Sequence, residues 1–303
     1  MPTTTATDGS TVVYESHGEG PPLLLIPGLG FGPWAWFKQV PALSRRFRVL
    51  TFDLRSPRDP EHGVAELARD AAVLLERSGV GRAHVLGTSL GGFVAQELAL
   101  RRPDLVDGLV LVSTSYGGRG DARMSPRTLA AMFGVGSFSP RGAARKGLKA
   151  ATSGAYRSRF PGEFEEIVST RLARSPSPFS YLQQARAGAA FDASPRVRNI
   201  SAPTLVIHGA EDRYVPVANA VALARAIPNA KLRILDDAGH LVFIERAEEF
   251  NEEVASFLLG YEEPAASGDR GRSAQGGTLP GWVRSLRRVP GRVARKLRDR
   301  LSG

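Results

Sequence analysis

The 303-residue sequence contains no cysteine, which excludes disulfide bonds, a thiolate nucleophile and cysteine-ligated metal sites. It also has no apolar run close to the ~20 residues that span a bilayer, so we expect no transmembrane helix. The N-terminal stretch lacks the basic and apolar regions of a secretory signal peptide. The lack of a signal peptide and of a membrane-spanning run, rather than the lack of cysteine, favours a cytoplasmic protein.

The overall composition is that of a globular protein, with 42% hydrophobic and 23% charged residues. These values exclude a chain that is disordered throughout, a fibrous repeat and a disulfide scaffold. The length allows one large α/β domain or two medium ones.

The charge is unevenly distributed along the chain. Residues 116–196 contain 13 Lys and Arg against 5 Asp and Glu, and residues 264–303 contain 10 against 2, so each segment has a net charge of +8. The remaining residues have a net charge of −6, and the whole chain therefore reaches +10. The chain thus has a slightly acidic core, a basic insertion and a basic tail. This distribution is a better guide to the binding partners than the net charge of the whole chain.

Apolar runs of strand length alternate with segments of helical periodicity, which predicts a mostly parallel sheet flanked by helices. Residues 116–196 interrupt this alternation with helical stretches and no strong strand. We therefore expect an α/β core at 1–115 and 197–263, an inserted helical cap at 116–196 and a flexible tail at 264–303. The expected strands are Val12–Ser16, Leu23–Ile26, Arg48–Asp53, Ala83–Leu86, Leu109–Val112, Thr204–His208 and Lys231–Leu235, and the expected helices are Val64–Arg77, Leu90–Arg101, Val217–Ala226 and Ala247–Leu259.

The tail has a linker-like start, rich in Gly, Ser and Pro, followed by apolar residues at helical spacing over 282–301. We favour a disordered, solubilising extension. An amphipathic helix at an anionic membrane surface is the second interpretation, which would make the protein peripheral to a membrane. Binding to nucleic acid or to an acidic protein is the least favoured. The apolar stripe comprises Trp282, Leu286, Val289, Val293, Leu297 and Leu301.

The sharpest motif is Gly87-Thr88-Ser89-Leu90-Gly91, between an expected strand and an expected helix. A G-x-S-x-G sequence in that context is typical of a nucleophile elbow, where a strained turn lifts the serine hydroxyl clear of the sheet. Small residues at 87 and 91 let the strand and the helix pass closely. We therefore predict that Ser89 is the nucleophile.

A serine nucleophile needs a base, and the base needs a group that orients it. Of the five histidines, His240 follows the last expected strand in a loop at the carboxyl end of the sheet, where ligands bind in open α/β folds. The acid that accompanies this motif lies between the serine and the histidine in the chain. Asp212 is our choice for the acid, with Glu211 as the alternative.

An oxyanion hole requires two preorganised backbone donors. The N–H of Leu90 follows the nucleophile at a helix N-terminus. The second donor is expected in the turn Pro27-Gly28-Leu29-Gly30 after the first buried strand, at the N–H of Leu29.

In these motifs the chain resembles the α/β-hydrolase superfamily over about Val12 to Leu259. The matching segments, in order, are LLLIPGLG, RVLTFDLR, HVLGTSLGGFVAQELAL, LVLVST, PTLVIHGAEDRYVP and DAGHLVFIERAEEF. The resemblance implies a catalytic triad of Ser89, Asp212 and His240, an oxyanion hole at Leu29 and Leu90, and acyl transfer to water with no metal and no organic cofactor. It does not separate an esterase from a lactonase, a thioesterase, an amidase or a C–C bond hydrolase.

The substrate, a small acyl compound, is expected to contact apolar and aromatic side chains of the insertion and of the turn region. The alternative for each of these side chains is a place in the core of the cap. The basic residues of the insertion favour either an anionic substrate or, as the simpler interpretation, a solvated surface. A non-catalytic ligand-binding protein is the alternative from another class. The substrate-binding candidates are Trp34, Trp36, Tyr116, Phe133 and Phe138.

Overall fold

The computed structural model describes residues 3–5, 11–59, 61–228 and 230–260. Its strands form one sheet in the order β1-β2-β4-β3-β5-β6-β7-β8. β1 pairs antiparallel with β2, and β2 pairs antiparallel with β4. The other neighbouring strands, which are β4, β3, β5, β6, β7 and β8 in sheet order, pair parallel. The strands are β1 Thr3–Thr5, β2 Thr11–His17, β3 Pro22–Ile26, β4 Arg48–Phe52, β5 Ala83–Thr88, β6 Val106–Val112, β7 Thr204–Gly209 and β8 Lys231–Leu235.

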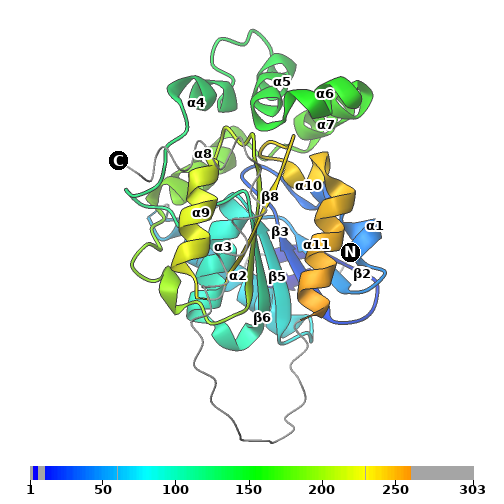
Figure 1. The fold of residues 1–303 in the computed structure, drawn as a ribbon, viewed down its shortest axis with the longest axis vertical. Helices are drawn as coiled ribbons and strands as arrows, with labels where there is room; N and C mark the ends of the chain where they lie inside the picture. Colours follow the sequence, from blue (N-terminus) through cyan, green and yellow to red (C-terminus); the bar gives the residue numbers. More distant parts are fainter. Residues whose placement is uncertain (1–2, 6–10, 60, 229, 261–303) are drawn as a thin grey trace, which may run out of the picture.

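Helices cover both faces of this sheet (Figure 1). α2 (Gly63–Arg77), α3 (Leu90–Arg101) and α9 (Val217–Ala226) pack on one face, and α11 (Ala247–Leu259) packs on the other together with the short α1 (Val40–Leu43) and α10 (Val242–Glu245). The predicted α/β fold with a mostly parallel sheet is confirmed.

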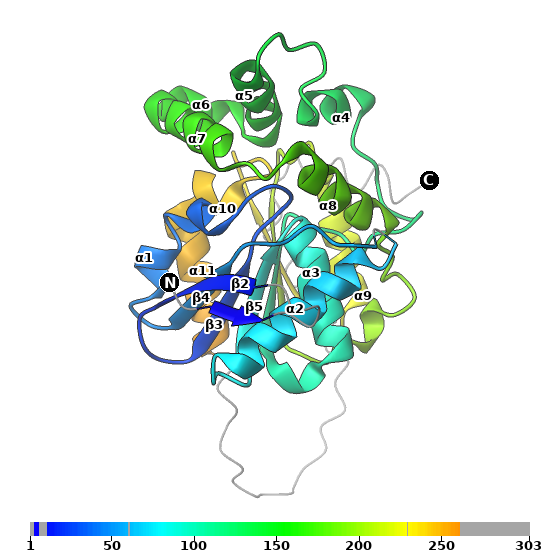
Figure 2. The ribbon, with the colours of Figure 1, turned by 180° about the vertical axis from the view of Figure 1, so that it is seen from behind.

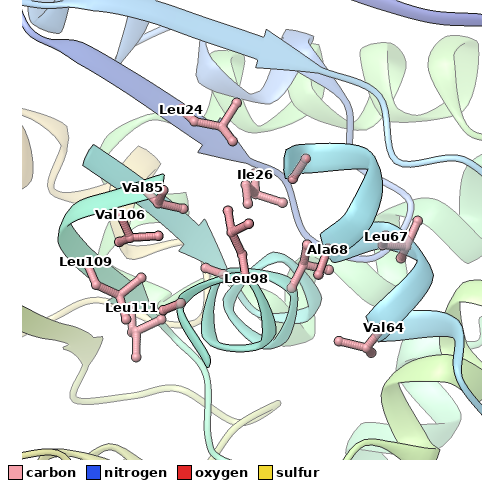
Figure 3. Close-up of a cluster of buried hydrophobic side chains, with 14 of the residues drawn as sticks. Leu24, Ile26, Val64, Leu67, Ala68, Val85, Leu98, Val106, Leu109 and Leu111 are labelled. Atoms are coloured by element: carbon pink, nitrogen blue, oxygen red, sulfur yellow. The ribbon is translucent and has the colours of Figure 1, made fainter. Parts of the chain in front are cut away.

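The alternation of side chains along the strands explains the two hydrophobic cores. In β3, Leu24 and Ile26 face α2 and α3, while Leu23 and Leu25 face the other core. Because both faces of a parallel strand are covered, the strand sequence is apolar throughout rather than alternating. Figure 3 shows part of the first core, in which side chains of β3, β5 and β6 are labelled together with Leu98 of α3 and Leu67 of α2.

Residues 116–196 fold into five helices between β6 and β7, and α4 to α7 lie above the end of the sheet in both views (Figures 1 and 2). α8 descends along α2 and α3. Serine and proline start several of these helices: Ser125, Ser139 and Ser177 each cap a helix whose first residue is proline. The helices are α4 Pro126–Met132, α5 Pro140–Ala151, α6 Gly154–Arg159, α7 Pro161–Arg174 and α8 Pro178–Ala190.

Three short 3-10 helices complete the described elements: η1 (Pro33–Trp36), η2 (Pro103–Leu105) and η3 (Val197–Asn199). The sequence patterns did not predict these, nor β1, α1 and α10, because elements of three or four residues are too short to display a period. The predictions for the tail at 264–303 and for its apolar stripe at 282–301 lie outside the described residues. Over the residues that are described, no helix is both long enough and apolar enough to cross a membrane.

Candidate active site

Ser89 sits at a sharp turn between β5 and α3, with φ 53° and ψ −116°. A positive φ is uncommon for a residue other than glycine and marks local strain. The turn is possible because its neighbours are glycines: a Cβ on Gly91 would lie 2.2 Å from the carbonyl oxygen of Ile26, and one on Gly87 would lie 2.2 Å from that of Gly91. The backbone thus has the form of the predicted nucleophile elbow.

Asp212 and His240 form a buried pair. Nδ1 of His240 lies 2.8 Å from Oδ2 of Asp212, and the two side chains are 8% and 0% exposed. A carboxylate can only accept, so Nδ1 donates, and the neutral imidazole then keeps an unprotonated Nε2. The two residues come from loops after β7 and β8, at neighbouring carboxyl ends of the sheet.

Asp212 is held as a carboxylate by its surroundings. Its Oδ1 accepts hydrogen bonds from the backbone N–H groups of Tyr214 and Val215 at 2.8 and 2.9 Å. Burial opposes the charge, but the imidazoles of His240 and His208 outweigh burial and hold the pKa of Asp212 well below its usual range. Nε2 of His208 lies 3.2 Å from Oδ2 of Asp212 and 2.8 Å from the carbonyl oxygen of Val215. The acid is therefore ionised across the working range of a histidine base.

The loop that carries His240 is fastened to the cap. The N–H of His240 donates to the carbonyl oxygen of Ala151, at the end of α5, at 2.7 Å. One carboxylate oxygen of Glu245 accepts from the N–H of Gly239 at 3.0 Å and the other from the N–H of Ser153 at 2.8 Å. Burial raises the pKa of Glu245, and these N–H donors oppose that rise.

Two backbone donors are available beside the nucleophile. Leu90 is the first residue of α3, where N–H groups lack partners within the helix. Neither its N–H nor that of Leu29 donates to an acceptor in the described residues. The two segments are in contact, because a Cβ on Gly28 would lie 3.3 Å from Cβ of Ser89. The turn after β3 and the elbow are thus in contact, as the predicted oxyanion hole at Leu29 and Leu90 requires.

Ser89 and His240 line one cavity of about 510 Å³, whose wall comes from the loops at the end of the sheet and from the cap. The structure shows no hydrogen bond between the side chains of these two described residues. Hydrogen bonds between catalytic residues are often too long in an enzyme without substrate and shorten when the substrate binds. The cavity wall is mostly apolar, as is usual for a small-molecule site. It includes Phe31, Met124, Met132, Phe133, Leu148, Leu172, Tyr181, Leu182, Tyr214 and Phe243.

Of the five substrate-binding candidates only Phe133 lines this cavity. Trp36 is fully buried and packs against Phe243, so it belongs to the core below the site. Trp34 borders a separate hollow of about 160 Å³ against α7. Tyr116 is partly buried against the first hydrophobic core, and Phe138 is fully exposed. The prediction that these four residues line the substrate cavity is therefore corrected. It failed because the sequence does not tell in which direction an aromatic side chain near a loop points.

The structure adds residues that the sequence did not single out. Arg171 and Tyr214 line the cavity, and the side-chain oxygen of Gln184 accepts from the N–H of Gly30 at 3.1 Å while its amide donates to the carbonyl oxygen of Leu54 at 2.8 Å. Arg171 was one of thirteen basic residues in the insertion, and no sequence signal distinguished it from the others. In the described part of the chain no group of three His, Asp or Glu side chains is arranged to hold a metal ion.

This fold and this site define an α/β protein with a serine at a nucleophile elbow and an aspartate–histidine pair beside it. The sequence pattern of the alpha/beta hydrolase fold family matches residues 21–247. The chain therefore belongs to the α/β-hydrolase fold family, and it is an enzyme of that family. The predicted resemblance is confirmed.

Curated relatives and solved structures agree with this assignment. The chain is 30% identical over 266 residues to "Putative carbamate hydrolase RutD" of Agrobacterium fabrum, a match covering 81% of this chain and 97% of the relative. It is 30% identical over 261 residues to the pimeloyl-[acyl-carrier protein] methyl ester esterase of Aeromonas hydrophila, covering 82% and 99%. The enol-lactonase of Burkholderia xenovorans has a similar structure, with a TM-score of 0.73, 28% identity and coverage of 85% and 100%.

Proposed function

We propose that this enzyme hydrolyses carboxylic esters through an acyl-enzyme on Ser89, with His240 as the base and Asp212 as the acid that orients it. The observation that carries the proposal is the 2.8 Å contact between Nδ1 of His240 and Oδ2 of Asp212, at a cavity that Ser89 also lines. A serine at the elbow with an oriented imidazole beside it is the arrangement that acyl transfer needs.

The steps follow from these positions. Oγ of Ser89 attacks the ester carbonyl and passes its proton to Nε2 of His240. The negative oxygen of the tetrahedral intermediate accepts hydrogen bonds from the N–H groups of Leu29 and Leu90. His240 then protonates the leaving alkoxide, and the acyl group remains on Ser89. Water, deprotonated by His240, attacks the acyl-enzyme and releases the carboxylic acid, which restores the serine hydroxyl.

Ester hydrolysis is the reaction we place first, and the names of two relatives support it, although other curated relatives are named as carbamate hydrolases. One curated relative carries the name of a methyl ester esterase, and a structural neighbour of 27% identity and TM-score 0.73 is an esterase from Rhodococcus. A lactone is a cyclic ester that uses the same steps, and the Burkholderia neighbour is an enol-lactonase. Thioester and C–C bond hydrolysis are the remaining alternatives on the same triad.

A substrate panel tests the proposal. Matched ester, lactone, thioester and β-diketone substrates are assayed with wild type and with Ser89→Ala, and we expect the ester to have the highest kcat/KM. Ser89→Ala should lose at least about 10³-fold in kcat on every substrate that wild type cleaves. An unchanged ester rate in Ser89→Ala would remove the role given to Ser89. A ligand that binds in the cavity without turnover in any class would favour a binding protein instead.

A further inference from the structure

Arg171 of α7 stands out among the residues that line the cavity. It is the single Lys or Arg in the described cavity wall, and no Asp or Glu is part of that wall. No described carboxylate forms an ion pair with it. The other twelve basic residues of the insertion lie outside the wall. The cavity thus carries one fixed positive charge with no negative charge to balance it.

The guanidinium is held in place by neutral groups. Its Nη1 donates to the carbonyl oxygens of Leu29, at 3.4 Å, and of Gly30. Its Cζ lies 4.4 Å from the ring centroid of Phe31 and 5.7 Å from that of Tyr181. Aromatic rings and carbonyl oxygens orient a cation without neutralising it. The side chain of Arg171 also makes a hydrogen bond with that of Tyr181. A guanidinium has five N–H donors and these contacts do not occupy all of them, so donors remain for a ligand.

Burial lowers the pKa of Arg171, since a charged group loses solvation in the partly buried wall. A guanidinium nevertheless stays protonated at neutral pH. An apolar wall with a lone cation therefore gains most from a ligand that brings its own negative charge, and the planar fork of arginine matches a carboxylate.

The position of Arg171 fixes where that charge would lie. The guanidinium contacts the carbonyl oxygen of Leu29, whose N–H is the proposed oxyanion donor. Gly28, the residue before it, is the one whose Cβ would touch Ser89. The backbone of Gly28 and Leu29 thus contacts both the guanidinium of Arg171 and the side chain of Ser89.

From this geometry we infer that the enzyme prefers esters whose acyl part ends in a second, free carboxylate, and that Arg171 binds this carboxylate while Ser89 attacks the ester carbonyl. The inference rests on the proposed function and adds the substrate class. A dicarboxylic acid monoester with a short chain between its two ends meets both requirements. After hydrolysis the product is a free dicarboxylate.

Matched pairs of substrates test this directly. Monoethyl succinate, glutarate and adipate are compared with ethyl butanoate, pentanoate and hexanoate, in which a methyl group replaces the carboxylate. The quantity of interest is the ratio of kcat/KM for the charged member to that for the neutral member of each pair. For wild type we expect a ratio of at least about ten for one chain length or more. A ratio below one at every length would overturn the inference.

Two variants separate ligand binding from a structural role. In Arg171→Met the ratio should fall at least about tenfold, chiefly through KM, because the charge is lost and the apolar stem is kept. Arg171→Lys keeps the charge without the fork and should retain an intermediate ratio. The control is Arg174→Met, on the same helix but exposed and outside the cavity wall, which should keep the wild-type ratio.

A merely structural role for Arg171 predicts a different result, with both members of each pair losing the same factor and the ratio unchanged. That outcome would overturn the inference and leave the proposed ester hydrolysis intact. Should wild type cleave neither the charged nor the neutral esters, the proposed function fails instead. If Arg171→Met does not fold, the wild-type ratio together with Arg171→Lys still decides the question.

Discussion

The carboxylate of Glu245 accepts a hydrogen bond from the backbone N–H of Gly239 at 3.0 Å, one residue before the base. Its other oxygen accepts from Ser153, at the start of α6 in the cap. One buried side chain thus joins the loop of His240 to the cap that closes the cavity. The position of the imidazole depends on this carboxylate as well as on Asp212.

Replacing Glu245 by alanine should destabilise the protein and slow catalysis together. Two buried N–H groups would lose their acceptor, at about 1–3 kcal/mol each, and the loop of His240 would be less well placed. We expect a free energy of unfolding lower by about 2–4 kcal/mol, measured with urea, and a lower kcat on a simple ester. Glu252→Ala, on the exposed side of α11, is the control and should change neither quantity. A Glu245→Ala protein with wild-type stability and kcat would contradict this account.

Asp212→Asn tests the orientation of the base. An amide in this position can turn its NH₂ group toward Nδ1, which would favour the tautomer with the proton on Nε2. We expect kcat to fall by about 10⁴-fold with little change in KM. The measurement is steady-state kinetics at neutral pH with circular dichroism to check the fold. Wild-type kcat in a folded Asp212→Asn protein would show that Asp212 does not orient the base.

The elbow tolerates no side chain at Gly91. A Cβ there would lie 2.2 Å from one backbone oxygen and 2.5 Å from another, those of Ile26 and Pro27, and neither can move without shifting β3. Gly91→Ala should therefore abolish activity and lower the thermal midpoint by several degrees. Gly162→Ala, where a Cβ meets nothing within 4 Å, should behave like wild type. Equal activity in the two variants would refute the close passage of β3 and α3.

Asp121 gives a pH dependence of stability. Burial raises the pKa of Asp121 to about 6, Asp192 adds to the rise, and its Oδ1 is buried without a partner. Between about pH 4 and 6 the native carboxyl keeps a proton that the unfolded chain releases, so its effect is to lower stability as pH rises through this range. Asp121→Asn cannot titrate. The stability of this variant minus that of wild type should therefore increase from pH 4 to pH 7, and a constant difference in urea unfolding would contradict the shift.

The sheet and its long helices could be predicted from the sequence because both signals are local. Most of the strands β3 to β7 are apolar runs ended by Gly, Pro or polar residues, β8 alternates basic and apolar residues, and α2 has apolar residues at helical spacing. Ser89 could be chosen for the same reason, since its strand, turn and helix lie within about twenty residues.

The cavity wall could not be predicted, because it depends on packing between distant segments. Arg171 contacts Leu29 and Gly30 across more than 140 residues, and no periodicity records such a contact. The same limit led to the error at Trp36, whose neighbour Phe243 is far along the chain. At these positions the residue type indicates which chemical group is present. Only the folded structure shows in which direction that side chain points.

The central claim is that Ser89 is the nucleophile of an acyl-enzyme, and covalent labelling tests it most directly. The full-length protein is treated with a fluorophosphonate, which reacts with an activated serine, and the modified peptide is identified by mass spectrometry. We predict a single adduct on Ser89, formed at a rate that falls sharply in His240→Ala. No adduct, or an adduct on another serine, would contradict it.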